Sequence, residues 1–479
     1  MLTTAATTPV RELVPVVRER LADLETPVSA FAKLRKLGGA FLLESVEGGE
    51  RMGRYSFIGV LPRATLVFRD GLASILEDGG ARALPYEDPL AIIRSELARY
   101  HRAGGSELPR FSGGAVGYVG YEAARRFERL PAAAREVLRL PEAAFSIYDT
   151  VVCFDHVRHS LLVIAHDVAG DRETAASRID RVFAALDAPL ALPSQPQRVV
   201  RSVTANGTPE EYRERVRRAR ELIGAGDCIQ IVVAQRFDVR PAPDPLALYR
   251  ALRHVNPSPY MFLIEAGGAT LVGASPEPFV RVENGRVVMH PIAGTRQRGR
   301  DEAQDLANEA ELRASEKERA EHVMLVDLTR NDIGRVSRPG TVKVRELMRV
   351  DRFSHVMHLT SVVDGELSPG LDALDAFRAC FPAGTVSGAP KIRAMERIAE
   401  LEPDRRGPYA GAVGYLGFDG RMDTCIGIRT AVIADGVCRI QAGAGIVADS
   451  DPAAEELETR AKARALLRAI EIVDGEATR

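Results

Sequence analysis

Two pairs of glutamates are spaced so that the members of each pair face the same side of a predicted helix. Glu318 and Glu321 lie near the start of one helix, and Glu455 and Glu458 follow Asp451-Pro452 at the start of the last one. Residues three apart are neighbours on a helix surface. Four carboxylates that met would repel one another unless a hard cation lay between them, and Mg²⁺ takes oxygen ligands. The spacing therefore predicts a magnesium site if the two helices meet.

Each pair also has a purely structural interpretation. Ser315 and Glu318 have the spacing of a capping box, and acidic side chains favour a helix N-terminus. Glu458 lies one helical turn before Lys462, which suits an ion pair that contributes about 0.3–0.5 kcal/mol on an exposed helix. The spacing alone leaves the metal site and these structural roles open.

Three further segments contain residues suited to binding an anion. Gln441-Ala-Gly-Ala-Gly445 follows a predicted strand, and its small residues let backbone N–H groups approach a carboxylate. Arg429 ends the run Ile426-Gly-Ile-Arg429 and can hold a carboxylate by two parallel hydrogen bonds. The segment 381–391 places Thr385 among glycines and prolines, as in an ordered binding loop. A simple turn for the glycines and an ordinary ion pair for Arg429 remain alternatives.

The elements that must position these residues are helices separated by pairs of strands. Thr208-Pro209-Glu210-Glu211 has the pattern of a capping box with proline at the first helical position. Alternating apolar residues on both sides of Asn284-Gly285 and of Asp435-Gly436 predict two β-hairpins. Strands that arrive in antiparallel pairs favour the α+β class over a doubly wound parallel sheet.

The chain divides near residue 200 and contains one internal sequence repeat. Prolines without apolar periodicity mark 188–198 as a linker, which predicts an N-terminal region, 1–198, and a second region, 199–479. Gly114-Ala-Val-Gly-Tyr118 recurs as Gly411-Ala-Val-Gly-Tyr415, as expected of equivalent strands in a duplicated unit. We therefore expect two related sheets that face each other.

Composition excludes several classes of function. The 479 residues are 46% hydrophobic and 27% charged, and the net charge is -2, so neither nucleic acid nor an anionic membrane is an expected partner. We find no apolar stretch near the ~20 residues of a membrane helix and no signal peptide at the N-terminus, so we expect a cytoplasmic protein. The five cysteines are widely spaced, which predicts reduced, buried thiols.

Several ordered motifs resemble those of the chorismate-utilising enzymes. They are the loop 381–391, Gly-Ala-Gly-Ile-Val-Ala-Asp-Ser-Asp-Pro at 443–452, Lys-Glu-x-x-Glu-His-x-Met-Leu-Val-Asp-Leu at 317–328 and Asn-Pro-Ser-Pro-Tyr-Met at 256–261. The resemblance covers 208–472, and the N-terminal region resembles the anthranilate synthase component I branch through Leu42-Leu-Glu-Ser45 and Arg54-Tyr-Ser-Phe57. It implies a four-layer α/β/β/α fold with two large packed antiparallel sheets.

The resemblance also implies roles for individual residues. Glu321 and Glu458 resemble the Mg²⁺ ligands, supported by Glu318 and Glu455 directly or through water. The expected binding site for chorismate consists of Thr385, Tyr409, Arg429, Gly443, Ala444, Gly445 and Lys462. Glu277 resembles the acid that protonates the leaving hydroxyl, and a raised pKa would keep it protonated. His358 is a candidate for proton transfer or orientation.

Two positions distinguish members of this family. Relatives that add water to chorismate carry lysine at the position of Gln230, which cannot act as a general base. Aminodeoxychorismate synthases typically carry a lysine nucleophile at the position of Ala293. Both differences indicate that ammonia is the nucleophile and that anthranilate, the first intermediate of tryptophan synthesis, is the product.

A partner and a regulator are implied as well. We see no segment with a glutaminase-type nucleophilic cysteine, so we expect ammonia from a separate glutamine amidotransferase subunit in a heterotetramer. A pocket for L-tryptophan as feedback inhibitor is expected at Glu44, Ser45, Arg54, Tyr55, Pro259, Tyr260 and Met261. The alternatives are an aminodeoxychorismate synthase component I and a noncatalytic tryptophan-binding regulator.

Overall fold

The computed structural model describes most of the chain. The described residues are 10–38, 40–45, 53–77, 80–102, 108–131, 135–137, 139–169, 171, 173–190, 199–352 and 356–475. The predicted linker spans 188–198, and its residues 191–198 lie outside the described residues. No helix in the described ranges is long and apolar enough to cross a membrane. All five cysteines are free and buried, as predicted.

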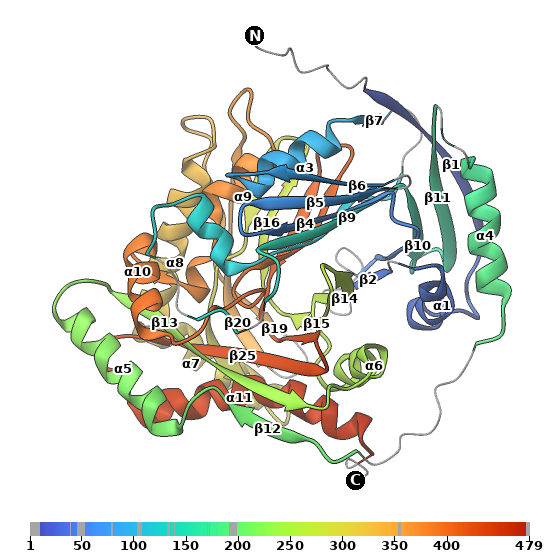
Figure 1. The fold of residues 1–479 in the computed structure, drawn as a ribbon. Coiled ribbons are helices and arrows are strands. Elements are labelled where there is room, and N and C mark those ends of the chain that lie inside the picture. The colour runs from blue at the N-terminus through green and yellow to red at the C-terminus, as the bar shows by residue number, and fades with distance from the viewer. Residues whose placement is uncertain are drawn as a thin grey trace.

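Two large sheets form the centre of the fold (Figure 1). The larger sheet has the order β12 (Ser202–Ala205), β13 (Gln230–Arg240), β25 (Val437–Ile446), β24 (Thr430–Ala434), β15 (Ala269–Ser275), β14 (Tyr260–Ala266), β2 (Phe41–Glu44), β3 (Tyr55–Gly59), β10 (Thr150–Asp155), β11 (Ser160–Val168), β1 (Arg11–Leu21) and β7 (Tyr100–Arg102), with β21 (Gly388–Ala389) beside β13. The smaller sheet has the order β18 (Ile292–Gln297), β20 (Val356–Glu366), β17 (Arg286–Met289), β16 (Pro278–Glu283), β23 (Met422–Ile426), β22 (Ala412–Gly417), β8 (Gly114–Val119), β9 (Ala143–Tyr148), β4 (Ala64–Arg69), β5 (Leu72–Glu77) and β6 (Gly80–Pro85), with β19 (Lys343–Arg352) beside β20. Neighbouring strands are antiparallel except β1 and β7, which pair in parallel.

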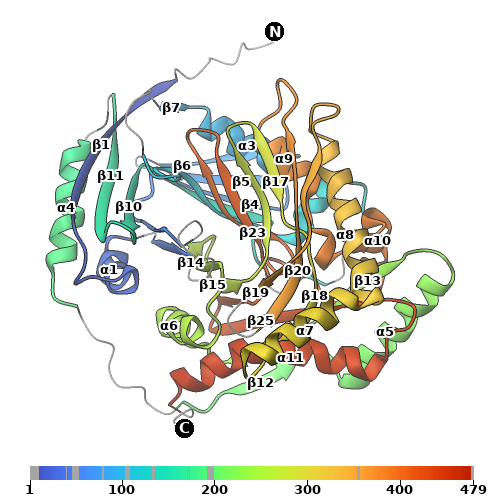
Figure 2. The same ribbon diagram turned by 180° about the vertical axis from the view of Figure 1, so that it is seen from behind.

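Helices cover the outer side of each sheet, so the predicted α+β, four-layer architecture is confirmed (Figures 1 and 2). The helices that pack on the larger sheet are α1 (Pro27–Leu34), α4 (Ala175–Asp187), α5 (Pro209–Gly224), α6 (Pro245–Val255), α10 (Lys391–Leu401) and α11 (Pro452–Val473). Those that pack on the smaller sheet are α3 (Pro89–Leu97), α7 (Glu302–Ala314), α8 (Glu316–Gly334) and α9 (Ala373–Cys380). Three short 3-10 helices, η1 (Arg35–Leu37), η2 (Tyr121–Arg126) and η3 (Gly384–Val386), complete the described elements.

Aromatic side chains fill the space between the two sheets. Phe41 of the larger sheet and Tyr148 of the smaller one meet edge to face, with ring centroids 4.8 Å apart. Phe111 packs between Phe57 and Tyr415, at centroid distances of 5.7 and 4.5 Å. Such pairs contribute about 0.5–1.5 kcal/mol each beyond their apolar burial. They hold the sheets at a fixed separation, on which the geometry of any site at their edge depends.

The internal sequence repeat reflects a repeated order of helices and strands. From β1 to α4 and again from β13 to α11, the chain forms comparable strands that occupy matching places in the two halves of each sheet. Strands β8 and β22, which contain the repeated sequence, lie side by side in the smaller sheet, with Gly117 opposite Gly414. The duplication therefore relates the two halves within each sheet. Both sheets contain strands from before and after residue 198. The predicted boundary therefore does not separate the sheets, and the division into 1–198 and 199–479 stays a prediction about function.

Capping and turn residues that the sequence predicted are found at the starts of three helices and in two hairpins. Ser315 caps α8 by accepting a hydrogen bond from the backbone N–H of Glu318 at 3.4 Å, and Asp451 caps α11. Thr208 and Glu211 form the predicted capping box of α5. Both hairpins are confirmed, because Asn284-Gly285 and Asp435-Gly436 have φ values of 52° and 71° and of 51° and 71°, which a tight two-residue turn requires.

Candidate active site

Glu277 lies between the end of β15 and the start of β16, next to the loop that carries Thr385. The Thr385 hydroxyl donates a hydrogen bond to Glu277 Oε1 at 2.8 Å. Burial raises the pKa of Glu277 to about 7, although this hydrogen bond and the nearby charges of Arg429 and Lys462 lower it. A carboxyl with this pKa is protonated in part at neutral pH and can act as a general acid.

Arg429 is a partly buried cation held in an unfavourable backbone conformation. Its φ is 50°, a region that side chains other than glycine rarely adopt and that is found mainly where structure around a site enforces it. Burial lowers the pKa of its guanidinium, while Tyr409, Glu277 and Glu458 raise it. In the described part of the chain, no acidic side chain forms an ion pair with this guanidinium. It is therefore suited to bind an anionic ligand.

A backbone cradle lies beside Arg429, on strand β25. A Cβ added to Gly443 would lie 2.7 Å from the Tyr409 hydroxyl, and one added to Gly445 would lie 2.6 Å from Gln230 Nε2. Lys462 donates a hydrogen bond to the Gly443 carbonyl at 2.9 Å. The Ala444 side chain is fully buried in the core, so this residue offers only its backbone to the cradle.

Each of the two glutamate pairs has a member that is affected by the charges of the same two lysines. Glu321 accepts a hydrogen bond from Gln230 at 3.2 Å, and Glu458 pairs with Lys462 at 2.6 Å. Burial raises the pKa of both Glu321 and Glu455, and the charges of Lys317 and Lys462 lower both. Because the same lysines act on both glutamates, α8 and α11 share one electrostatic neighbourhood.

The donor set suits a magnesium ion, although the side chains do not form a ready cluster. Among the described residues, no group of three or more acidic, histidine or cysteine side chains is close enough to hold a metal ion. Glu318 pairs with Arg296 at 3.1 Å, and Lys462 neutralises Glu458. The carboxylates present nevertheless supply the oxygen ligands that Mg²⁺ prefers. Glu321 and Glu458 would hold the ion, and Lys462 would have to release Glu458.

His358 is fixed on β20, at the border of the site. Its Nδ1 lies 3.0 Å from the Gly294 carbonyl and 3.0 Å from the Thr295 hydroxyl. Burial lowers the pKa of His358, and the charge of Arg429 lowers it further. A neutral imidazole in this position can accept a proton.

The residues expected to bind tryptophan surround a cavity of about 60 Å³. Six of the seven line it: Glu44, Ser45, Tyr55, Pro259, Tyr260 and Met261. Arg54 is not among the lining residues; its guanidinium pairs with Asp155 at 2.8 Å. Glu44 accepts a hydrogen bond from Tyr249 at 2.5 Å and lies 3.3 Å from Arg253.

The polar end of this cavity and one positioning residue could not be recognised from sequence patterns. Arg110, Arg281 and Asp423 also line the cavity, and Tyr260 donates a hydrogen bond to Asp423 at 2.9 Å.

The positioning residue is Arg406, whose side chain is 1% exposed. It pairs with Glu402 at 2.6 Å, donates to the Val386 and Val232 carbonyls and lies over the Tyr409 ring. Its place in the charged run 404–406 is typical of a surface, so the sequence contained no signal for this role.

Comparison with known proteins gives consistent matches over nearly the whole chain. The family described as chorismate binding enzyme matches residues 40–468. The chain is 50% identical over 473 residues to anthranilate synthase component 1 of Streptomyces coelicolor, covering 96% of this chain and 89% of that protein. It is 48% identical to the component 1 of Thermus thermophilus, covering 96% and 98% of the two chains.

Two solved structures share the fold. Anthranilate synthase component I from Streptococcus pneumoniae superimposes with a TM-score of 0.79 at 38% identity, covering 86% of this chain and 92% of that one. The menaquinone-specific isochorismate synthase from Escherichia coli superimposes with a TM-score of 0.73 at 18% identity, covering 97% and 96%. The second likeness concerns the fold alone.

Proposed function

The chain belongs to the family of chorismate-binding enzymes, and we propose that it acts as anthranilate synthase component 1, which aminates chorismate and eliminates pyruvate to give anthranilate in tryptophan synthesis. One observation carries this proposal: the Arg429 cation, which has no ion-pair partner among the described residues, lies beside Glu277, an acid whose pKa is raised to about 7. A carboxylate clamp next to a protonated acid suits a dicarboxylate substrate that must lose a hydroxyl group.

The proposed reaction uses these residues in two steps. Arg429 and the backbone amides near Gly443 hold the enolpyruvyl carboxylate, and Tyr409 closes the cradle. Ammonia adds to the ring while Glu277 gives its proton to the C4 hydroxyl, which leaves as water. In the second step the C2 proton is removed and pyruvate leaves, which restores aromaticity. His358 is proposed to accept or orient a proton in this step.

Magnesium is part of the proposal. Mg²⁺ held by Glu321 and Glu458 would neutralise and orient the ring carboxylate of chorismate. Glu318 and Glu455 would support these ligands from the first turns of α8 and α11. Lys462, once released from Glu458, would remain on the Gly443 carbonyl and contribute positive charge.

Ammonia is proposed to come from a glutamine amidotransferase subunit. Burial raises the pKa of every one of the five cysteines, so none of them is suited to be the reactive thiolate of a glutaminase. The component 1 relatives are named as parts of a larger enzyme. Free, buried thiols are compatible with the reducing cytoplasm, where we place the protein.

The assay that tests the proposal supplies chorismate, Mg²⁺ and ammonium at pH 8 to 9. We expect anthranilate fluorescence and pyruvate to appear together and to require the metal, with EDTA as the control. Consumption of chorismate without pyruvate would instead indicate an aminodeoxychorismate synthase. Tryptophan binding without any turnover would indicate a noncatalytic regulator.

Replacing Gly443 by alanine is expected to weaken chorismate binding. The added Cβ would lie 2.7 Å from the Tyr409 hydroxyl and would displace it from the cradle. A lost hydrogen bond to a charged group costs about 1.5–3 kcal/mol, so KM should rise by about tenfold or more. Gly224→Ala in α5, where an added Cβ meets nothing within 4 Å, is the matched control. Equal KM values for both variants would contradict the proposed cradle.

We also propose that the cavity at Glu44 and Met261 binds tryptophan as an inhibitor. An acid for the amino group and an apolar slot for indole are present, and Arg110 lies at the polar end. Glu44→Gln keeps an acceptor for Tyr249 but removes the charge. Tryptophan should then bind about tenfold more weakly or worse, with kcat within about twofold of the original.

Binding can be measured by fluorescence, because the chain contains no tryptophan. Glu265→Gln is the control, since Glu265 lies on the same strand, β14, outside the cavity. If Glu44→Gln retained full inhibition, the assignment of this cavity to tryptophan would be wrong.

A further inference from the structure

Tyr409 must hold its hydroxyl beside the cradle for the proposed clamp to work. An added Cβ on Gly443 would lie 2.7 Å from that hydroxyl, so its oxygen borders the place proposed for the enolpyruvyl carboxylate. Burial raises the pKa of Tyr409 to about 12, although the charges of Arg406 and Arg429 lower it. The hydroxyl therefore keeps its proton at the pH of the assay and can donate a hydrogen bond to a carboxylate.

The backbone around Tyr409 has a conformation that its neighbours must enforce. Residues 406–411 lie between α10 and β22, outside any helix or strand. Gly407 has a φ of 63° and Ala410 a φ of 61°. Because Ala410 carries a Cβ, this conformation costs free energy and persists only where surrounding contacts hold it. The position of Tyr409 therefore depends on what the two ends of this segment contact.

The later end of the segment is joined to the segment of Arg429. The backbone N–H of Ala410 donates a hydrogen bond to the Gly427 carbonyl at 3.0 Å, and the N–H of Gly427 donates to the Gly411 carbonyl at 2.8 Å. Gly427 lies two residues before Arg429. These two hydrogen bonds therefore fix the clamp cation and Tyr409 relative to each other on one side.

The earlier end of the segment is held by η2, which belongs to the first half of the chain. Glu122 accepts hydrogen bonds from the backbone N–H groups of Arg406 at 2.7 Å and of Gly407 at 2.9 Å, one on each carboxyl oxygen. Burial raises the pKa of Glu122, and these two hydrogen bonds lower it. The backbone N–H of Tyr121 donates to the Gly407 carbonyl at 2.8 Å. Two consecutive residues of η2 thus hold residues 406 and 407.

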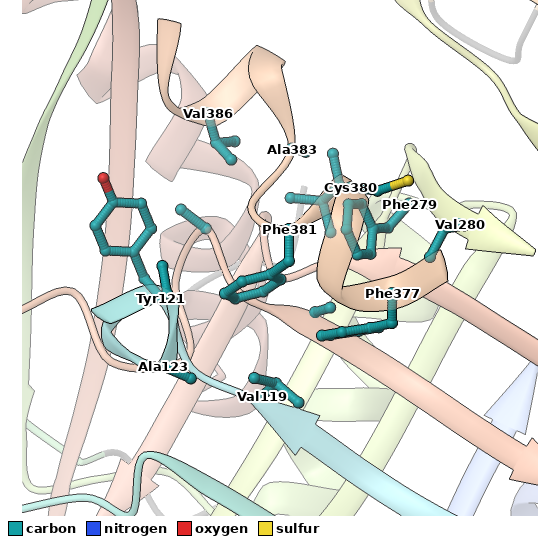
Figure 3. Close-up of a cluster of buried hydrophobic side chains, with 14 of the residues drawn as sticks. Val119, Tyr121, Ala123, Phe279, Val280, Phe377, Cys380, Phe381, Ala383 and Val386 are labelled. Carbon is teal, nitrogen blue, oxygen red and sulfur yellow. The ribbon is translucent and has the colours of Figure 1, made fainter. Parts of the chain in front are cut away.

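The same helix also packs against this segment through an aromatic ring. The guanidinium carbon of Arg406 lies 4.6 Å from the centroid of the Tyr121 ring and 5.6 Å from that of the Tyr409 ring. Tyr121 belongs to the buried cluster that contains Phe381 and Val386 of the Thr385 loop (Figure 3). The contact between η2 and residues 406–407 is therefore part of a packed interface, to which Glu122 contributes two hydrogen bonds.

We propose that Glu122 is a positioning residue for chorismate binding, because its carboxyl group holds residues 406–407 and thereby keeps the Tyr409 hydroxyl at the cradle. This inference rests on the proposed function. Glu122 acts through the backbone that carries Tyr409, without touching the substrate. The N-terminal half of the chain then supports the chorismate site directly, in addition to the role expected for it in tryptophan binding.

The acid Glu277 should be affected much less than the cradle. The loop that carries Thr385 is held by β13, through the pairing of β21 with β13 and through a hydrogen bond from the Val232 N–H to the Ser387 carbonyl at 3.0 Å. These supports are separate from Glu122. Loss of the Glu122 contact should therefore weaken substrate binding and leave the hydrogen bond from Thr385 to Glu277 in place.

The first test compares Glu122→Gln with the unaltered protein. Glutamine replaces one acceptor oxygen by an NH₂ group, so one of the two backbone N–H groups would face a donor. We expect KM for chorismate to rise by at least about fivefold, since small displacements of a group that binds a charged substrate are costly. The kcat should stay within about threefold. Hydrogen exchange should become faster at the amides of residues 406 and 407.

Glu142→Gln is the matched control. Glu142 is also half-buried, and its side chain accepts two hydrogen bonds at 2.9 Å from Arg126, the last residue of η2. Its replacement weakens a different contact of the same short helix, so KM should stay within about twofold of the original.

A double-mutant cycle with Tyr409→Phe identifies the route of the effect. Tyr409→Phe removes the hydroxyl and should raise KM by itself. If Glu122 acts through this hydroxyl, adding Glu122→Gln to Tyr409→Phe should change KM by less than about twofold. Two increases in KM that multiply would overturn the inference, because Glu122 would then act on another part of the site.

The outcomes separate this inference from the proposed function. An unchanged KM for Glu122→Gln, or an equal rise for Glu142→Gln, would overturn the role of Glu122 and leave the reaction standing. If Glu122→Gln is too unstable to assay, Gly120→Ala decides, because its added Cβ would lie 3.1 Å from the Gly407 carbonyl oxygen and displace the same segment. KM should rise about twofold or more, and an unchanged KM would refute the role. An unaltered chain that made neither anthranilate nor pyruvate would refute the proposed function itself.

Discussion

Glu277→Gln should lower kcat for anthranilate formation by about 10²–10⁴-fold, the usual contribution of a positioned general acid. Glutamine keeps the size of the side chain and the oxygen that accepts the hydrogen bond from Thr385. Chorismate should therefore still bind, with KM changed by less than about threefold. Steady-state kinetics with ammonium as nitrogen donor measure both quantities. A variant with more than a tenth of the original kcat would remove Glu277 from the mechanism.

The pH dependence of kcat gives a second measure of the same role. Burial raises the pKa of Glu277 to about 7, so the protonated acid is abundant below pH 7 and is lost as the pH rises through it. At saturating free ammonia, kcat should fall above pH 7 in the unaltered enzyme. The small residual activity of Glu277→Gln should lack this fall, because the amide does not ionise.

Stability provides the control for folding. A carboxyl whose pKa is raised on folding binds more protons in the folded than in the unfolded state between pH 4.5 and 7. The unaltered protein therefore loses stability as the pH rises through this window, and Glu277→Gln does not. We expect the melting temperature of the variant to be at least that of the unaltered protein at pH 8, with a smaller difference at pH 5.

Arg429→Lys should lower kcat/KM for chorismate by about 10- to 100-fold, mostly through KM. Lysine keeps the charge but cannot form the two parallel hydrogen bonds of a guanidinium with a carboxylate. Hydrogen bonds to charged groups are worth about 1.5–3 kcal/mol, which sets this range. A lysine variant with normal KM would show that Arg429 acts only as a distant charge.

Arg429→Met separates binding from folding at the same position. Burial lowers the pKa of Arg429, which indicates that its desolvation is not fully compensated by partners in the described part of the chain. Methionine removes the partly desolvated charge at similar length, so the variant should bind chorismate poorly and yet melt at the same or a higher temperature. Calorimetry together with chorismate titration measures both effects. A large loss of stability would indicate a structural role for Arg429.

Features encoded by short segments could be predicted from the sequence. The hairpin at Asn284-Gly285 follows from two residues that tolerate positive φ, and the first turns of α8 and α11 follow from local caps. The glutamate pairs belong to the same category, since their shared face depends only on helical spacing.

Features that depend on tertiary packing could not be predicted in this way. Arg406 positions Tyr409 through carbonyls of two distant segments, and its charged neighbours in the sequence suggested solvent exposure. Lys462 was expected in the pocket, but its bonds to Glu458 and to the Gly443 carbonyl depend on how α11 packs against β25. Arg110 reaches its cavity only because the two sheets face each other.

The way in which both sheets combine strands from the two halves of the chain has consequences for folding during synthesis. Glu44 pairs with Met261, and Tyr118 pairs with Val413. Strands β2 and β8 are therefore synthesised long before the strands with which they form hydrogen bonds. Contacts between residues so distant in sequence slow folding and leave strand edges open in the meantime. The N-terminal half should therefore need protection from aggregation until β14 and β22 emerge, and chaperone dependence should fall in two steps, first when nascent chains include β14 and again when they include β22.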